Sequence, residues 1–304
     1  MSIQFTDIVN KLPASVPFVG PEAQERSINQ IFKARIGANE SVFGPSEKAI
    51  SAMKKQQSEV WMYGDPENFD LKHALAKKHK VNFENIVVGE GIDGLLGYLV
   101  RLIIEKRDNV VTTDGAYPTF NYHVEGFGGN LHKVPFCNDK EDLQNLLDKV
   151  RETSAKILYV SNPNNPMGTI NKPSDIERLI QNLPETTLLC LDEAYIDFVD
   201  ENFVPKISLD KKNVIRMRTF SKAYGMAGLR VGYAIGEKDL ILNFEKIRNH
   251  FGMSRISQVG ALAALEDYDF ISDVINKVKL SRNRIGEIAN NNNRKFIPSF
   301  TNFV

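Results

Sequence analysis

Short apolar runs rich in β-branched residues alternate along the chain with segments of helical periodicity, and this alternation restricts the fold more than any other feature. The runs expected to form strands are 85–89, 109–113, 131–134, 156–160, 187–192, 213–218 and 229–235. Helix-like segments lie between most of them, at 92–105, 118–128, 139–152 and 173–182. This order predicts an α/β fold with a mostly parallel sheet covered on both faces, and such sheets bind ligands at the carboxyl ends of their strands.

Helical patterns also lie on both sides of this block. They are found at 46–57 and 67–79 before it, and at 237–249, 254–266 and 268–292 after it. Asp65 can cap the second of these helices, and Pro66 fits its first turn. The segment 294–304 is strand-like, so we expect a further strand there.

The composition is that of an ordinary globular protein. Of 304 residues, 38 are Lys or Arg and 38 are Asp or Glu, so no overall charge attracts nucleic acid or an anionic membrane. No apolar run approaches the roughly 18 residues that span a bilayer, and residues 1–12 lack a secretory pattern. The five histidines show no metal-ligand spacing. We therefore expect a cytoplasmic protein with no membrane or nucleic-acid partner and no metal site.

Lys222 follows a predicted strand in a setting that suits a phosphorylated carbonyl compound. Thr219 and Ser221 provide hydroxyls, and Arg230 provides a guanidinium eight positions further on. Hydroxyls and a guanidinium together suit a phosphate dianion, while a lysine amine can capture a carbonyl group. A lone lysine is usually a solvated surface residue, so this interpretation depends on the neighbouring groups.

Two upstream segments place polar residues at the ends of other predicted strands. Asp192 ends the apolar run 187–192, where an ionised carboxylate needs a cationic partner such as a protonated pyridine nitrogen. Asp192 could instead cap the following turn, and Tyr195 could donate a hydrogen bond to a ring oxygen or merely pack. The Asn-Pro-Asn-Asn-Pro turn before Gly168 also follows a strand, although such turns are common in loops.

The order of three motifs makes the interpretation specific. The segments NPNNPMG, DEAY and SKAYGMAGLRVG resemble the cofactor-binding signature of class I/II aminotransferases, most closely the histidinol-phosphate aminotransferase branch. The similarity extends from about Asn39 to Val304. It implies a fold type I enzyme that binds pyridoxal 5'-phosphate (PLP), with a seven-stranded, mostly parallel sheet and a smaller α+β domain.

The resemblance assigns roles to the residues of these motifs, position by position. It implies that Lys222 forms the Schiff base with the cofactor and moves the proton between the cofactor and the substrate Cα. Asp192 matches the partner of the pyridine nitrogen, while Asn165 and Tyr195 match the pair that binds the ring oxygen. The phosphate-binding residues of the family match Thr219, Ser221 and Arg230.

Other segments of the resemblance extend the expected site. GEGIDGLLGYL implies that the backbone amides of Ile92 and Asp93 open a helix beneath the phosphate, where the helix dipole favours an anion. Phe120 matches the aromatic residue that stacks on the pyridine ring, although core packing explains it nearly as well. Tyr63 matches a tyrosine that reaches the phosphate in the neighbouring subunit, which implies a homodimer. Asn39 matches a substrate-contacting position.

The resemblance also predicts how the chain is divided. We expect an N-terminal arm and the start of a small domain in residues 1–45, a large PLP-binding domain in 46–265, and a linking helix with an incomplete small domain in 266–304. Family members continue beyond a segment like PSFTNFV, and the continuation carries the arginine that binds the substrate anion. Met167 departs from the family, which usually has threonine there, and Ser41 lies where some members of the histidinol-phosphate branch have tyrosine.

The expected activity is transamination between an amino acid or amino-alcohol phosphate and a 2-oxo acid. Histidinol phosphate with 2-oxoglutarate is the leading substrate pair, and an aromatic or other amino acid is an alternative. A PLP-dependent phosphothreonine decarboxylase and a non-catalytic PLP-binding module remain open as well.

Overall fold

The computed structural model describes residues 3–13 and 18–304. Residues 1–2 and 14–17, which belong to the predicted N-terminal arm, lie outside the described residues. The strands are β1 (Ile86–Gly89), β2 (Asn109–Thr113), β3 (Asn130–Val134), β4 (Ile157–Ser161), β5 (Leu188–Asp192), β6 (Val214–Thr219) and β7 (Gly232–Gly236). They form one sheet in the order β1-β7-β6-β5-β4-β2-β3. The predicted seven-stranded α/β fold is therefore confirmed.

One strand makes the sheet mixed. Strand β7 runs antiparallel to both β1 and β6, whereas the pairs β6–β5, β5–β4, β4–β2 and β2–β3 are parallel. The carboxyl ends of β4, β5 and β6 consequently lie together with the amino end of β7. This edge is where the sequence predicts the ligand-binding residues.

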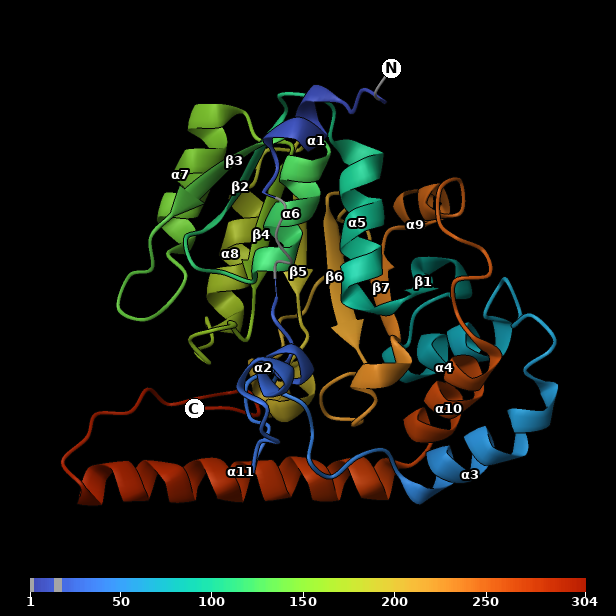
Figure 1. Ribbon diagram of the computed structural model, residues 1–304. Helices are drawn as coiled ribbons and strands as arrows, with labels where there is room; N and C mark the ends of the chain where they lie inside the picture. The colour runs from blue at the N-terminus through green and yellow to red at the C-terminus, as the bar shows by residue number, and fades with distance from the viewer. Residues whose placement is uncertain (1–2, 14–17) are drawn as a thin grey trace.

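Helices cover both faces of the sheet. They are α1 (Asp7–Lys11), α2 (Pro21–Ile28), α3 (Glu47–Lys55), α4 (Phe69–His79), α5 (Gly91–Ile103), α6 (Pro118–Gly126), α7 (Leu143–Thr153), α8 (Pro173–Asn182), α9 (Lys238–Phe244), α10 (Arg255–Leu265) and α11 (Tyr268–Asn291). Short 3-10 helices occupy Gln57–Glu59, Phe83–Asn85, Ile196–Phe198, Glu201–Phe203 and Ala227–Leu229. Figure 1 shows α11 running across the bottom of the view, with the C-terminal segment returning above it.

The central strands are apolar on both sides. Ile157 and Tyr159 of β4 pack into the layer that contains α5, while Leu158 and Val160 pack against α7 and α8. This two-residue alternation, with every residue buried, is typical of a strand covered by helices on both faces. Among residues 3–13 and 18–304, no helix combines the length and apolar character that crossing a bilayer requires.

Several local predictions are wrong. Helix α7 begins at Leu143 rather than 139, and helix α9 ends at Phe244 rather than 249. The segment 294–304 is irregular rather than a strand, because its backbone makes isolated hydrogen bonds instead of a ladder with a neighbouring strand. The Phe300 amide donates to the Gly168 carbonyl at 2.7 Å, and Arg282 donates to the Thr301 carbonyl at 2.7 Å. Helix α4 begins at Phe69 rather than 67, because Asn68 adopts a left-handed conformation with φ of 52°. The domain division at 45 and 265 stays a prediction.

Candidate active site

A cavity of about 510 Å³ lies at the carboxyl ends of β4, β5 and β6. The final residues of these strands, Ser161, Asp192 and Thr219, all line it. Its other lining residues are Phe18, Gly37, Ala38, Asn39, Glu40, Ile92, Asp93, Tyr117, Pro118, Thr119, Asn165, Ala194, Tyr195, Ser221, Lys222, Ala227 and Arg230. The fold thus gathers nearly all the residues that the sequence predicts for the site.

Lys222 presents its amine to this cavity. Its Nζ donates to the carbonyl of Ala38 at 3.1 Å and lies 3.4 Å from the carbonyl of Asn39. Burial lowers the pKa of the Lys222 amine, while the negative charges of Glu40 and Asp192 oppose this effect. A lysine with a lowered pKa is neutral in a larger fraction of molecules, so it can act as a nucleophile or a base.

Asp192 is a buried carboxylate at the end of β5. Its Oδ2 accepts a 2.6 Å hydrogen bond from the Tyr159 hydroxyl, and its Oδ1 accepts one of 2.9 Å from the Ala194 amide. Burial raises the pKa of Asp192 to about 6, and both hydrogen bonds oppose this increase. No lysine or arginine pairs with Asp192 among the described residues. A cationic ligand group in the cavity would therefore complement it.

The Tyr195 hydroxyl lies between two asparagine amides. Asn39 donates to it from Nδ2 at 3.1 Å, and Asn165 donates from Nδ2 at 3.5 Å. The rings of Tyr195 and Phe303 are nearly perpendicular, at 86°, with their centroids 5.4 Å apart. Three segments that are distant in sequence therefore meet at one hydroxyl group.

Hydroxyl and guanidinium groups gather at the end of β6. Thr219 Oγ1 donates to Ser221 Oγ at 2.9 Å, and Arg230 Nη1 donates to the same Ser221 oxygen at 3.4 Å. Arg230 also lies 3.7 Å from a carboxylate oxygen of Asp93. Together these groups can bind a phosphate dianion.

The sheet register brings the start of α5 to the same place. Gly232 of β7 pairs with both Thr219 of β6 and Gly89 of β1, so the start of α5, two residues after Gly89, lies at the same edge of the sheet as Thr219. A Cβ atom at Gly232 would stand 2.7 Å from the backbone of Gly91 and Ile92, which only glycine avoids. Free amides at a helix N-terminus favour an anion, as the sequence predicts for Ile92 and Asp93.

Two predicted residues do not reach the cavity wall. The Phe120 ring has no exposed area and stacks on Tyr159, with centroids 4.5 Å apart and planes 15° apart. Tyr117, three residues before Phe120, does line the cavity, and its hydroxyl donates to Asp93 at 2.9 Å. Tyr63 is 75% exposed and packs against Phe251, at a centroid distance of 4.6 Å, outside this cavity.

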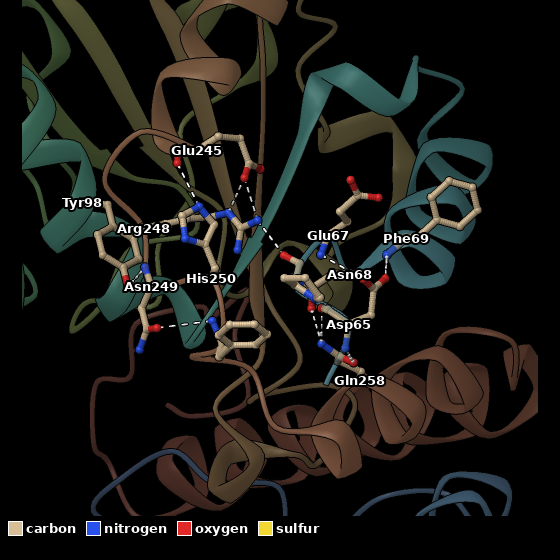
Figure 2. Close-up of polar contacts among 12 residues, drawn as sticks. Asp65, Glu67, Asn68, Phe69, Tyr98, Glu245, Arg248, Asn249, His250 and Gln258 are labelled. Carbon is tan, nitrogen blue, oxygen red and sulfur yellow. Dashed lines mark hydrogen bonds and ion pairs between the residues drawn. The ribbon is translucent and has the colours of Figure 1, made fainter. Parts of the chain in front are cut away.

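Hydrogen bonds fix the segment that carries Tyr63. Gln258 of α10 donates from Nε2 to the Asp65 carbonyl at 2.8 Å and to Asn68 Oδ1 at 2.9 Å. Figure 2 shows these contacts beside Arg248, whose Nη2 donates to the Pro66 carbonyl at 2.6 Å. The backbone next to the exposed Tyr63 ring is therefore held in place.

The sequence interpretation missed three groups at or beside the site. Tyr159 binds Asp192, Tyr117 binds Asp93, and Glu40 acts electrostatically on Lys222. Tyr159 lies two residues before the end of β4, which was the available signal: it points to the same face as Ser161. Among residues 3–13 and 18–304, no group of three or more His, Cys, Asp or Glu side chains could hold a metal ion.

Comparisons with known proteins identify the class. Residues 33–291 match the aminotransferase class I and II family, and the chain belongs to that family. It is 32% identical over 302 residues to the histidinol-phosphate aminotransferase of Staphylococcus haemolyticus, covering 97% of this chain and 85% of that protein. It is 34% identical over 274 residues to the histidinol-phosphate aminotransferase of Macrococcus caseolyticus, covering 89% and 77%.

A solved structure is similar over almost the whole chain. The histidinol-phosphate aminotransferase of Sinorhizobium meliloti, crystallised in complex with pyridoxal-5'-phosphate, superposes with a TM-score of 0.95 at 48% identity. The similarity covers 99% of this chain and 81% of that one. The predicted family is therefore confirmed.

Proposed function

We propose that this protein is a PLP-dependent aminotransferase that acts on histidinol phosphate and 2-oxoglutarate. The observation that carries the proposal is the presence, in one cavity, of a half-buried lysine amine and a buried carboxylate that has no cationic partner among the described residues. The names of the relatives from Staphylococcus, Macrococcus and Sinorhizobium support the choice of substrate.

The residues of the cavity fit PLP in three places. Thr219, Ser221 and Arg230, with the amides of Ile92 and Asp93, would bind its phosphate. Asp192 would bind the pyridine nitrogen, and Tyr195 with Asn165 would bind the ring oxygen. When bound, PLP supplies an electron sink for the negative charge that develops at the substrate Cα. For the ring face, Tyr117 lines the cavity, whereas the predicted Phe120 does not.

Lys222 would perform the proton transfer. Because burial lowers its pKa, Nζ is available to accept the proton that leaves Cα and to return it elsewhere on the ligand. Tyr195 and Asn39 lie on the same side of the cavity as Nζ, since the carbonyl of Asn39 is 3.4 Å from that nitrogen. We propose that this side receives the substrate.

The spectrum of purified protein with PLP tests the proposal. Titration with L-histidinol phosphate should convert the visible absorption of the lysine-linked cofactor to that of the pyridoxamine form, and 2-oxoglutarate should reverse the change. Lys222→Ala should abolish both the visible band and turnover, while Lys238→Ala, at the start of α9, should retain them. Retained turnover in Lys222→Ala would refute the assignment.

Alternative substrates give different outcomes in the same experiment. Conversion by an aromatic amino acid but not by histidinol phosphate would replace the proposed substrate. Release of carbon dioxide from phosphothreonine would identify a decarboxylase, and binding of PLP without any conversion would identify a non-catalytic module.

A homodimer is part of the proposal. The exposed Tyr63 ring lies outside its own cavity on a fixed segment, so it is available to the cofactor site of a second copy. A cytoplasmic location stays a prediction of the sequence.

A further inference from the structure

Glu141 is a buried carboxyl group that the proposed chemistry does not use. It lies between β3 and α7 and is 3% exposed. Its Oε2 accepts a 3.1 Å hydrogen bond from the backbone amide of Ser161, the last residue of β4 and part of the cavity wall. The carboxyl group therefore contacts the chain where β4 passes into the Asn-Pro turn.

The turn that follows Ser161 carries Asn165. Asn164 closes it locally, since its Oδ1 accepts the Met167 amide at 3.0 Å. A second contact joins the turn to the Glu141 loop, because the Thr169 hydroxyl donates to the Asp139 carbonyl at 2.7 Å. The loop that contains Glu141 thus contacts both ends of the turn.

The surroundings of Glu141 favour its neutral form. Burial raises the pKa of Glu141 to about 8, the negative charge of Asp192 raises it as well, and the Thr113 hydroxyl, the Ser161 amide and Asn164 oppose the increase. Tyr159 is the other titratable group that faces it from the sheet. Across the groove that it lines, the charged groups are Lys140, Asp142, Arg151, Asp175 and Arg178.

We propose that Glu141 is a positioning residue, which holds the amide of Ser161 and thereby places the turn and the side chain of Asn165 at the cavity. The proposal rests on the proposed function, because Asn165 is assigned there to the cofactor's ring oxygen. Without an acceptor at position 141 the buried Ser161 amide would lose its partner, which is costly enough to shift the local backbone.

Hydrogen–deuterium exchange of cofactor-free protein tests the proposal directly. Glu141→Ala should accelerate exchange of the turn amides between Asn164 and Gly168 about tenfold. The same variant should weaken PLP binding, measured by absorbance titration, by about tenfold, because Asn165 is no longer held. Glu141→Gln keeps an acceptor oxygen for Ser161, so both quantities should stay within about twofold of the wild type at pH 7.

The pH profile separates positioning by a titrating carboxyl group from simple packing. Because the pKa is raised in the folded state, the wild type should lose stability as pH rises from about 5 through about 8. Glu141→Gln cannot ionise at position 141, so the melting temperature of this variant should rise relative to that of the wild type as the pH increases across this range. A difference between the two proteins that does not change with pH would contradict the raised pKa of Glu141, and the exchange data would then decide its positioning role.

Thr187→Val is the matched control. Its buried hydroxyl donates to the Ala155 carbonyl at 2.7 Å at the opposite end of β5, so the variant loses one buried hydrogen bond far from the turn. Its turn exchange should equal that of the wild type. Equal exchange in Glu141→Ala and wild type, or equal acceleration in Thr187→Val, would overturn the proposal. Failure of the wild type to bind PLP would refute the proposed function, while the exchange data would still decide the role of Glu141.

Discussion

At the residue scale, the Tyr195 hydroxyl shows how the N-terminal segment takes part in the site. A phenol oxygen has two acceptor positions and one hydrogen. Because Asn39 and Asn165 both donate to this oxygen, its own hydrogen is free for a ligand in the cavity. The side chain of Asn39, expected from the sequence to contact the substrate, binds the Tyr195 hydroxyl.

A double-mutant cycle tests this role of Asn39. Asn39→Gly removes the amide but accommodates the φ of 54° at this position, and kcat/KM should fall about fivefold to tenfold through the loss of one hydrogen bond. In a Tyr195→Phe background the same change should have little further effect. Asn29→Gly, at an exposed position with φ of 52°, is the matched control and should match the wild type. Additive losses in the double variant would show that Asn39 acts independently of Tyr195.

The protonation of Asp192 predicts a pH dependence of cofactor binding. Burial raises the pKa of Asp192 to about 6, and only the ionised carboxylate complements a cationic ring nitrogen. The affinity for PLP should therefore be highest above pH 6. Below that value it should fall by on the order of tenfold for each pH unit.

Asp192→Asn provides the reference curve for this titration. The amide does not ionise in this range, so any pH dependence that the variant retains belongs to the cofactor and to other groups. Fluorescence or absorbance titrations between pH 4.5 and about 8 measure both curves. Parallel curves for the two proteins would exclude Asp192 as the titrating group.

Sequence motifs predict the site residues that directly follow the ends of strands, but they do not predict which side chains of the surrounding helices face the cavity. Lys222, Asp192 and Asn165 were predictable because parallel strands bring their carboxyl ends together. Tyr117 and Phe120 lie three residues apart around the start of α6, and sequence alone could not tell which faces the cavity and which faces Tyr159. The difference depends on how α6 packs on the sheet.

At the scale of secondary-structure elements, the positions of the strands were more predictable from the sequence than the ends of the helices. All seven predicted strands exist within three residues at each end, because apolar runs between turns must be buried. The antiparallel direction of β7 was not visible, since a single apolar run fits either direction. At α4 neither the cap residue nor the start was placed correctly: the N-cap is Asn68 rather than Asp65, although Asp65 Oδ2 accepts the Phe69 amide at 2.7 Å from outside the helix. The segment 294–304 has the composition of a strand but pairs with none of the strands described here.

A buried ion-pair cluster connects β5 to β6 directly behind the site. Glu193 has no exposed side-chain area and binds Arg216 at 2.7 Å and Arg218 at 2.8 Å. Glu193→Gln should lower the free energy of unfolding by about 3–5 kcal/mol, because the buried Arg218 and the half-buried Arg216 lose their counter-charge. Glu152→Gln, in an exposed pair with Lys149, is the control and should cost at most about 0.5 kcal/mol. Urea unfolding measures both, and equal effects would contradict the difference in burial.

At the scale of the whole molecule, the surface around Tyr63 has the character of an interface. Trp61 is 78% exposed and Phe251 is 51% exposed, and both lie near the Tyr63 ring in sequence or in space. Gln258 and Arg248 hold the backbone of this surface in place. Exposed aromatic residues of this kind are enriched at protein–protein interfaces. A second copy of this chain would cover them and bring Tyr63 to its cofactor site.

Mixing two inactive variants tests whether Tyr63 acts across subunits. Lys222→Ala removes the amine from its own site, and Tyr63→Ala removes the ring that would serve the partner's site. In a mixed dimer both changes then fall on one site and the other is intact, so random exchange of subunits should restore roughly one quarter of the wild-type sites. Cofactor titration and turnover before and after mixing measure the gain, and sedimentation gives the mass. A dimer that regains no function would show that Tyr63 serves its own subunit, and a mass of one chain would remove the interface altogether.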